Sequence, residues 1–359
     1  MFVLDSYPVA VVFCVITMLC WGSWANTQKL AGKTWRFELY YWDYVFGVML
    51  MALIFAFSMG STGGSGRSFL QDVKQAEAAN LGWALLGGVV FNAANILLVA
   101  AIAVAGMSVA FPVGIGLALA VGVVVNYADD PTGNAVVLFV GVAFVAAAII
   151  LDAMAYRKLP GQAKGAGAKG LTLSVLCGIL MGLFYLLVAK SMAKVELPGG
   201  EPLPVTTENL QAGVLQAGKL TSYTATVFFS LGVLLSNFLF NTAIMLKPVQ
   251  GTPVAPSDYL KGTSGDHLWG VVGGCIWAVG MTFSIIAAGQ AGFAISYGLG
   301  QGATMVAALW GVFIWKEFRD APPGTNRLLA LMFAGYFIGL ALIIVARKWD
   351  DIFQVAHVF

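Results

Sequence analysis

The sequence predicts an all-α integral membrane protein with ten transmembrane helices, arranged as two inverted five-helix repeats. Three observations predict this fold class. First, 59% of the 359 residues are hydrophobic and only 10% are charged, whereas a soluble domain is about 25% charged. Second, apolar stretches of about 20 residues, long enough to cross a bilayer, recur along the chain. Third, a segment of the first half aligns without gaps with a segment of the second half.

Ten apolar stretches make up most of the chain, and short loops join most of them. The first stretch lies close to residue 1, but it lacks a basic leading segment and an A-x-A-like cleavage site. We therefore expect a retained helix there and no cleaved signal peptide. The ten predicted spans cover residues 8–28, 38–58, 81–104, 107–126, 135–155, 171–190, 223–245, 267–289, 293–315 and 327–347.

The loops on the two sides of the predicted membrane differ in their content of lysine and arginine. One side carries twelve basic residues and the other carries seven. The positive-inside rule makes the richer side cytoplasmic, and an even number of spans then places both termini in the periplasm or outside the cell. We expect a multi-pass protein of the cell inner membrane. The richer side holds Lys29, Lys33, Arg36, Arg157, Lys158, Lys164, Lys169, Lys247, Lys261, Lys316, Arg319 and Arg327.

An internal repeat relates the two halves. At a shift of 186 positions, residues 81–116 align with residues 267–302 without a gap. A shift of 185 aligns the second span with the seventh in the same way. The paired residues include Trp83 and Trp269, Gly87-Gly88 and Gly273-Gly274, Gly106 and Gly292, and Gly47 and Gly232.

The repeat divides the chain into two units of five spans. The first repeat covers residues 1–156, a cytoplasmic linker covers 157–170, and the second repeat covers 171–359. An odd number of spans per unit gives the two units opposite orientations. Inverted repeats of this kind are typical of secondary transporters, which bind their solute between the halves near the midplane of the bilayer.

Several classes of function are excluded by composition and motifs. All four cysteines fall within predicted spans and only two histidines occur, His267 and His357, so we expect no disulfide framework and no metal site. A net charge of +2 is too small to indicate nucleic acid binding. The sequence has no hydrolytic triad and no P-loop, so we expect no catalytic residues, no cofactor and no direct coupling to ATP.

Asp43 is a candidate for proton coupling, because an unpaired carboxylate within a bilayer costs roughly 3 kcal/mol or more and such residues are often functional. It lies just inside the cytoplasmic edge of the second span, where burial favours the protonated form that a proton carrier needs. The alternative is a structural role within the surrounding aromatic residues, with its charge neutralised by Lys29, Lys33 or Arg36.

Asp152 is the second candidate for proton coupling. It also falls within a predicted span, but it is followed shortly by Arg157 and Lys158. A salt bridge at the cytoplasmic surface is the alternative explanation for its presence.

Amide side chains on common helix faces are candidates for binding the solute, since they donate and accept hydrogen bonds without a charge to desolvate. Asn92 and Asn95 share a face of the third span. Asn237 and Asn241 share a face of the seventh span with Ser230.

Aromatic residues in the spans are candidates for stacking on the rings of a solute; helix packing is the alternative for each of them. In the ninth span, Gln301 and Thr304 accompany them, and the glycines of residues 298–302 indicate close helix contacts or a helix break near the site. The aromatic candidates are Trp21, Trp24, Trp277 and Tyr297.

Five motifs together resemble the drug/metabolite transporter superfamily, in particular its sugar porter (glucose/ribose porter) and ureide permease branch, with some likeness to rhamnose-proton symporters. The resemblance covers most of the chain and implies ten helices in two inverted halves, a central polar cavity and proton-coupled uptake. Plant ureide permeases carry a long cytoplasmic loop after the fifth span, and the loop is short here. The motifs are Trp21-Gly22-Ser23-Trp24, Tyr41-Trp42-Asp43-Tyr44, Gly87-Gly88 with Asn95, Gly106-Met107-Ser108, and Lys316-Glu317.

The sequence and this resemblance predict a secondary transporter that imports a small neutral polar solute, a sugar in the first place, by proton symport. The alternatives are a ureide or nucleobase permease of the same fold, or an exporter of metabolites or drugs. A receptor without transport activity would need a larger soluble domain than the loops provide. The expected partners are the solute, protons and the lipid bilayer, and a homodimer is left open.

Overall fold

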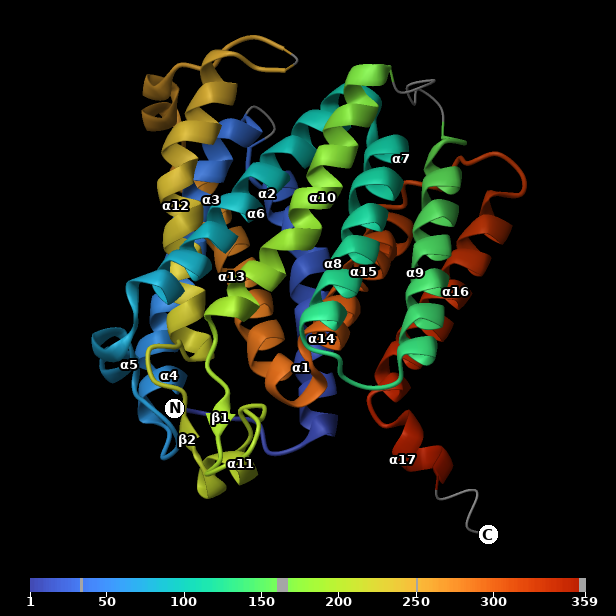
Figure 1. Ribbon diagram of the computed structural model, residues 1–359. Helices are drawn as coiled ribbons and strands as arrows, with labels where there is room; N and C mark the ends of the chain where they lie inside the picture. Colours follow the sequence, from blue (N-terminus) through green and yellow to red (C-terminus); the bar gives the residue numbers. More distant parts are fainter. Residues whose placement is uncertain (33–34, 160–166, 250, 355–359) are drawn as a thin grey trace.

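The computed structural model describes residues 1–32, 35–159, 167–249 and 251–354, and most of these residues lie in helices (Figure 1). Ten helical segments of the described chain are long and apolar enough to cross a membrane, which confirms the ten predicted spans. Their bounds are α1 Tyr7–Ser23 with α2 Ala25–Leu30, α3 Phe37–Phe57, α6 Ala78–Ala105, α8 Gly116–Asp129, α9 Ala135–Tyr156, α10 Ala168–Ser191, α12 Ser222–Leu246, α13 Ser264–Ala291, α14 Phe293–Gly300 with α15 Ala303–Leu309, and α16 Thr325–Ala346.

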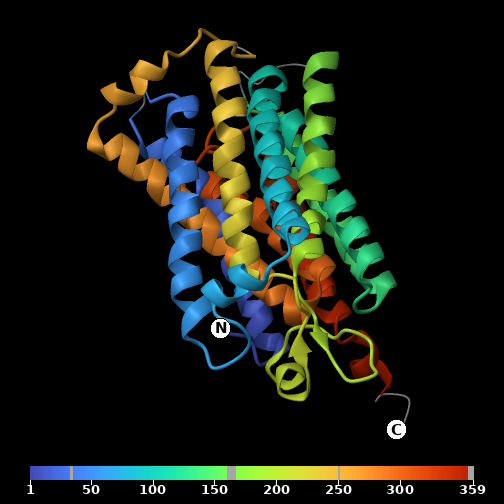
Figure 2. The same cartoon turned by 60° about the vertical axis from the view of Figure 1, so that its left-hand side comes forward.

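Large apolar side chains cover the outward faces of the spans. Phe57, Leu239 and Phe337 each expose more than half of their surface. A soluble monomer rarely leaves so many such residues in contact with water, whereas lipid tails solvate them. The helices stand side by side as an upright bundle (Figure 2), as expected of a multi-pass membrane protein.

The fourth and ninth spans are irregular, and both begin at a glycine that ends the preceding helix. Gly106 (φ +77°) follows α6 and Gly292 (φ +85°) follows α13; glycine adopts such angles without steric cost. Each span also contains a π-helical turn, which is frequent at functional sites. The short pieces are α7 Met107–Ala110, η1 Phe111–Ile115 and η3 Trp310–Ile314.

Close helix crossings involve the glycines of the repeat. Helix α13 crosses α3 so tightly that a Cβ on Gly274 would lie 1.9 Å from the carbonyl oxygen of Tyr44. The equivalent crossing of α6 with α12 places Gly88 in the same position, where a Cβ would lie 1.9 Å from the carbonyl oxygen of Phe229. Both crossings thus use the glycines that the sequence repeat aligns.

The division at residues 156 and 171, and the inverted orientation of the two repeats, stay predictions. Of the linker 157–170, residues 160–166 lie outside the described chain, as do Lys33 and His357.

Both chain ends lie at the same end of the bundle, the lower end in Figure 1, as an even number of spans requires. This termini end also carries the long 192–221 connection, in which two short strands pair antiparallel. The described basic residues lie at the two ends as the sequence predicts, and which end faces the cytoplasm stays a prediction. The small elements here are α4 Met59–Thr62, α5 Phe69–Gln75, β1 Val195–Glu196, α11 Thr207–Ala212, β2 Val214–Leu215 and α17 Trp349–Gln354; η2 Pro256–Lys261 lies at the opposite end.

Candidate functional site

A cavity of about 170 Å³ lies between the two halves of the chain. Helices α1, α6 and η1 line it from the first half, and α10, α13 and the α14–α15 break line it from the second. None of its lining residues carries a formal charge. This central cavity is therefore suited to a neutral solute. Of the sequence candidates, it brings together Trp21, Trp24, Asn95, Trp277, Gln301 and Thr304.

Asn95 is held in one orientation by a chain of hydrogen bonds. Its side-chain NH₂ donates to the hydroxyl of Tyr41 at 2.9 Å, and that hydroxyl donates to Oδ1 of Asn92, also at 2.9 Å. The NH₂ of Asn92 donates to Oγ of Ser236 at 2.9 Å. Asn92 therefore supports Asn95 from outside the cavity lining, and the carbonyl oxygen of Asn95 has no partner among the described residues.

Gln301 lies at the break between α14 and α15, as the glycine pattern predicts. Its backbone carbonyl accepts from the hydroxyl of Thr304 at 2.9 Å. Within the described chain its carboxamide makes no hydrogen bond, although the side chain lines the cavity. The cavity thus holds one free acceptor on Asn95 and a free donor and acceptor on Gln301.

Two indoles form a wall of the cavity. The rings of Trp21 and Trp277 are nearly parallel, with centroids 5.8 Å apart, and Nε1 of Trp21 donates to the carbonyl oxygen of Trp277 at 3.2 Å. The ring of Phe91 packs on the indole of Trp277, with centroids 4.5 Å apart. Trp24 lines the same space and packs on Tyr44. These contacts fix flat apolar surfaces next to the free amides.

Three other candidates from the sequence lie outside the cavity lining. Asn237 is fully buried, and its amide has no hydrogen-bond partner in the described structure. Asn241 donates to the backbone carbonyl of Glu38 at 2.8 Å. The hydroxyl of Tyr297 donates to the carbonyl oxygens of Met181 and Ala118, so its contacts are those of helix packing.

Asp152 lines a second space of about 140 Å³, which adjoins the central cavity past Thr304 and Phe111. One oxygen of its carboxylate is buried without a hydrogen-bond partner among the described residues. The expected salt bridge with Arg157 or Lys158 is not formed there.

The same space reaches the end of the bundle opposite the termini. At that end, Nζ of Lys29 contacts Oε1 of Glu317 at 2.9 Å, and the hydroxyl of Tyr156 donates to Oε2 of Glu317 at 2.8 Å. We call this space the vestibule. It lies between the central cavity and the loops that carry the larger number of basic residues.

Asp43 lies in neither space. Its carboxylate is buried between α3 and α13, where it accepts from the hydroxyl of Tyr259 and contacts Nδ1 of His267 at 2.9 Å. Burial raises the pKa of the Tyr259 phenol, so this hydroxyl stays protonated and donates. The sequence argument missed His267 because 224 positions separate it from Asp43. Lys29 and Arg36 pair instead with Glu317 and Glu38.

We expect Asp43→Asn to lower stability and to leave uptake of the solute intact. The substitution removes the charge that faces His267, and a buried hydrogen bond to a charged group contributes about 1–3 kcal/mol. Thermal unfolding of the purified protein measures the first effect, and gradient-driven uptake measures the second. Asp258→Asn is the matched control, since its pair with Lys261 is exposed; its unfolding midpoint stays at the wild-type value. Loss of uptake in a stably folded Asp43→Asn variant would show that Asp43 takes part in transport.

Ten spans around a neutral cavity that both halves line define a membrane permease for small solutes. The ureide permease family profile matches residues 40–164 and 168–346. The chain therefore belongs to the ureide permease family, which places it among transporters and not among enzymes.

Individual relatives extend over nearly the whole chain. Ureide permease 1 and ureide permease 4 of Arabidopsis thaliana are 22% and 24% identical to it, and each alignment covers 96% of this chain and 99% of the relative. A solved crystal structure superposes with a TM-score of 0.61 at 15% identity, covering 96% of this chain and 99% of the solved chain. That likeness supports the fold.

The family comparison decides part of the sequence-based expectation. The predicted likeness to ureide permeases is confirmed. The expected sugar finds no support among these relatives, and the ureide alternative fits them better. The wider drug/metabolite superfamily and the rhamnose symporters are not among the matches reported above.

Proposed function

We propose that this protein carries a ureide, a small neutral solute with ureido N–H and C=O groups, across the membrane by alternating access through the central cavity. The observation that carries the proposal is the free carbonyl oxygen of Asn95 and the free carboxamide of Gln301, beside the stacked indoles of Trp21 and Trp277. The names of the relatives supply the class of solute.

The chemistry of a ureide matches these groups. A ureido group is planar, its N–H groups donate and its carbonyl accepts. The free carbonyl of Asn95 accepts one such N–H, and the carboxamide of Gln301 pairs with both kinds of group. The planar ring of a cyclic ureide stacks on an indole. A sugar ring is puckered and presents hydroxyl groups, so it makes less contact with the flat indole surface than a planar ring does.

The position of the vestibule supports one orientation of the protein in the membrane. It lies between the central cavity and the end of the bundle where basic loop residues are more numerous, which the positive-inside rule assigns to the cytoplasm. The protein then lies in the cell inner membrane with both termini outside, and the vestibule lies on the cytoplasmic side of the central cavity.

Asp152 is the proton carrier in this proposal. Its carboxylate lines the space that adjoins the solute cavity, and one of its oxygens is buried without a partner. A carboxylate in that position is stabilised by taking up a proton. The carboxylate of Asp43 already has His267 and Tyr259 as partners, so it is less suited to carry a proton.

The proposal is tested by binding of a labelled ureide such as allantoin to the protein in lipid nanodiscs. We expect Asn95→Ala and Gln301→Ala each to weaken binding about tenfold, since a lost hydrogen bond in a closed site is worth about 1–3 kcal/mol. Asn209→Ala on α11 makes the same chemical change far from the cavity and keeps wild-type affinity.

Unlabelled glucose, ribose and uracil serve as competitors. We expect excess allantoin to displace the label and the two sugars to leave it bound. Displacement by a sugar at lower concentration than allantoin would reverse the assignment and favour a sugar transporter. Displacement by uracil alone would favour a nucleobase permease of the same fold.

A further inference from the structure

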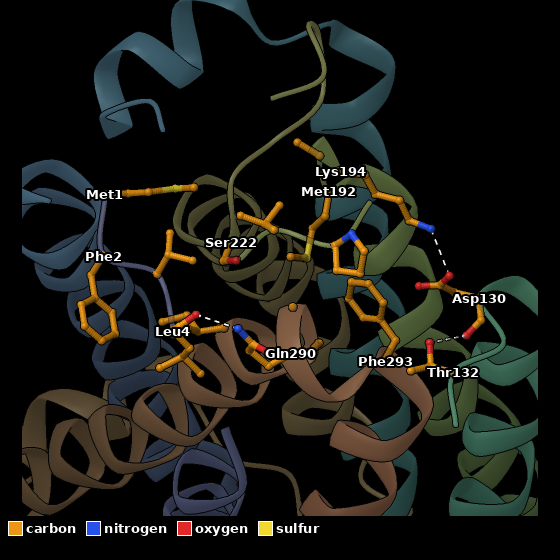
Figure 3. Close-up of a pocket in the computed structure, with 18 of the residues that line it drawn as sticks. Met1, Phe2, Leu4, Asp130, Thr132, Met192, Lys194, Ser222, Gln290 and Phe293 are labelled. Atoms are coloured by element: carbon orange, nitrogen blue, oxygen red, sulfur yellow. Dashed lines mark hydrogen bonds and ion pairs between the residues drawn. The ribbon is translucent and has the colours of Figure 1, made fainter. Parts of the chain in front are cut away.

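A third space lies at the termini end of the bundle, on the far side of the central cavity from the vestibule. It measures about 50 Å³ and lies among the first residues of the chain, the loop after α8, the segment after α10 and the junction of α13 with α14. Figure 3 shows Lys194 pointing to Asp130 across its rim, and Gln290 donating to the carbonyl oxygen of Leu4. We call it the outer pocket.

A barrier of aromatic side chains lies between the outer pocket and the central cavity. Phe293 lines the outer pocket and Phe184 lines the central cavity. The ring of Tyr185 stands between them, with centroids 6.0 Å from Phe293 and 5.9 Å from Phe184. The three rings therefore form a row from the lining of the outer pocket to the lining of the central cavity, with Tyr185 in the middle.

Polar contacts hold this barrier shut. The hydroxyl of Tyr185 forms hydrogen bonds with Oγ of Ser284 at 2.8 Å and Oγ of Ser296 at 3.3 Å. The thiol of Cys14, which is almost fully buried, lies 3.8 Å from the same Oγ of Ser296. Opening of the barrier has to separate these groups, and it would expose Cys14.

One ion pair lines the vestibule and another lines the outer pocket, and the two occupy equivalent places in the predicted repeats. Lys29, just after α1, pairs with Glu317, just after the ninth span, at 2.9 Å. Lys194, just after α10, pairs with Asp130, just after α8, at 3.0 Å. Each pair joins the first span of one predicted repeat to the fourth span of the other.

We propose that the outer pocket is the closed second mouth of the solute path, and that the two ion pairs are matched latches, Lys194–Asp130 at this mouth and Lys29–Glu317 at the vestibule. The inference rests on the proposed alternating access. Both pairs are partly exposed to solvent, so each is weak and can break and re-form. A small change in either latch shifts the balance between two conformations that differ by a few kcal/mol.

Cys14 provides a native reporter for the state of the outer mouth. In a variant that keeps only this cysteine (Cys20→Ala, Cys177→Ala, Cys275→Ala), we measure its alkylation by a membrane-impermeant maleimide in sealed vesicles of both orientations. Lys194→Glu is expected to raise the rate from the termini side about two- to fivefold, the range for a partly exposed ion pair. Lys29→Glu is expected to lower it.

Charge exchange separates a latch from a merely structural role. The double variant Lys194→Asp with Asp130→Lys restores the pair with reversed polarity, and we expect its labelling rate to return to the wild-type value. Lys348→Glu is the matched control, because its pair with Asp351 lies at the start of α17 and neither residue lines the outer pocket; its rate stays unchanged. If Lys194→Glu does not fold, Asp130→Asn removes the pair more mildly and predicts the same rise.

An unchanged rate in Lys194→Glu, or a raised rate that the double variant does not reverse, would overturn the inference. Labelling of Cys14 requires no knowledge of the solute. If the protein fails to bind ureides but shows these rate changes, the latch proposal stands and the assigned substrate is wrong. If the protein binds ureides but the labelling rate of Cys14 is the same in all variants, the assigned substrate stands and the latch proposal is wrong.

Discussion

Asp152→Asn is expected to abolish proton-driven accumulation of the ureide while exchange of the solute across the membrane continues. Asparagine keeps the size and polarity of the side chain but cannot take up a proton. A one-unit pH gradient supplies about 1.4 kcal/mol per proton, which supports about a tenfold concentration ratio at one proton per solute. Without the carrier this ratio falls to one.

Reconstituted vesicles separate the two activities. Uptake of a labelled ureide under an inward proton gradient measures accumulation, and counterflow without a gradient measures exchange. Asp320→Asn is the matched control, since this exposed residue at the same end of the bundle lines neither the vestibule nor the central cavity; it keeps both activities. Tenfold accumulation by Asp152→Asn would show that another group carries the proton.

Helix geometry explains why the salt bridge that the sequence offered as an alternative for Asp152 does not form. Side chains on a helix meet at separations of three and four residues, whereas Arg157 and Lys158 follow Asp152 by five and six. They therefore point away from its face. The sequence does not show what the Asp152 face of α9 points toward, because that depends on how α9 packs beside the vestibule.

Sequence spacing also leaves open which way the two asparagine-bearing helix faces point. Spacing predicts that Asn92 with Asn95, and Asn237 with Asn241, share helix faces, but a polar face can meet a cavity or a neighbouring helix. The first stripe turns Asn95 into the cavity and places Asn92 behind it. The second stripe turns toward α3, where Asn241 binds the carbonyl oxygen of Glu38.

The spans and the break in the ninth span were predictable because they follow from local rules. Backbone groups in lipid must be satisfied within the segment, so length and hydropathy define a helix. Contacts between distant segments follow no such rule. Asp43 meets His267 and Tyr259 only after α13 and η2 have packed against α3, and nearby cations in the sequence are a poor guide to that partner.

Gly274→Ala and Gly88→Ala are expected to destabilise the protein by similar amounts. In each case the new Cβ would lie 1.9 Å from a backbone carbonyl oxygen of the crossing helix, and only a shift of the whole helix can relieve the overlap. Overpacking of this kind costs about 1–3 kcal/mol or more. Thermal unfolding of each variant in the same detergent measures the loss.

The comparison of the two losses also tests the internal repeat. Gly82→Ala, on the same helix as Gly88, meets no atom within 4 Å and is expected to be neutral or slightly stabilising, because alanine favours helix over glycine by about 1 kcal/mol. Losses at Gly88 and Gly274 that agree within about 0.5 kcal/mol, and that add in the double variant, indicate two independent and equivalent crossings. A large loss at only one of them would mean that the two halves share a sequence pattern without sharing its packing.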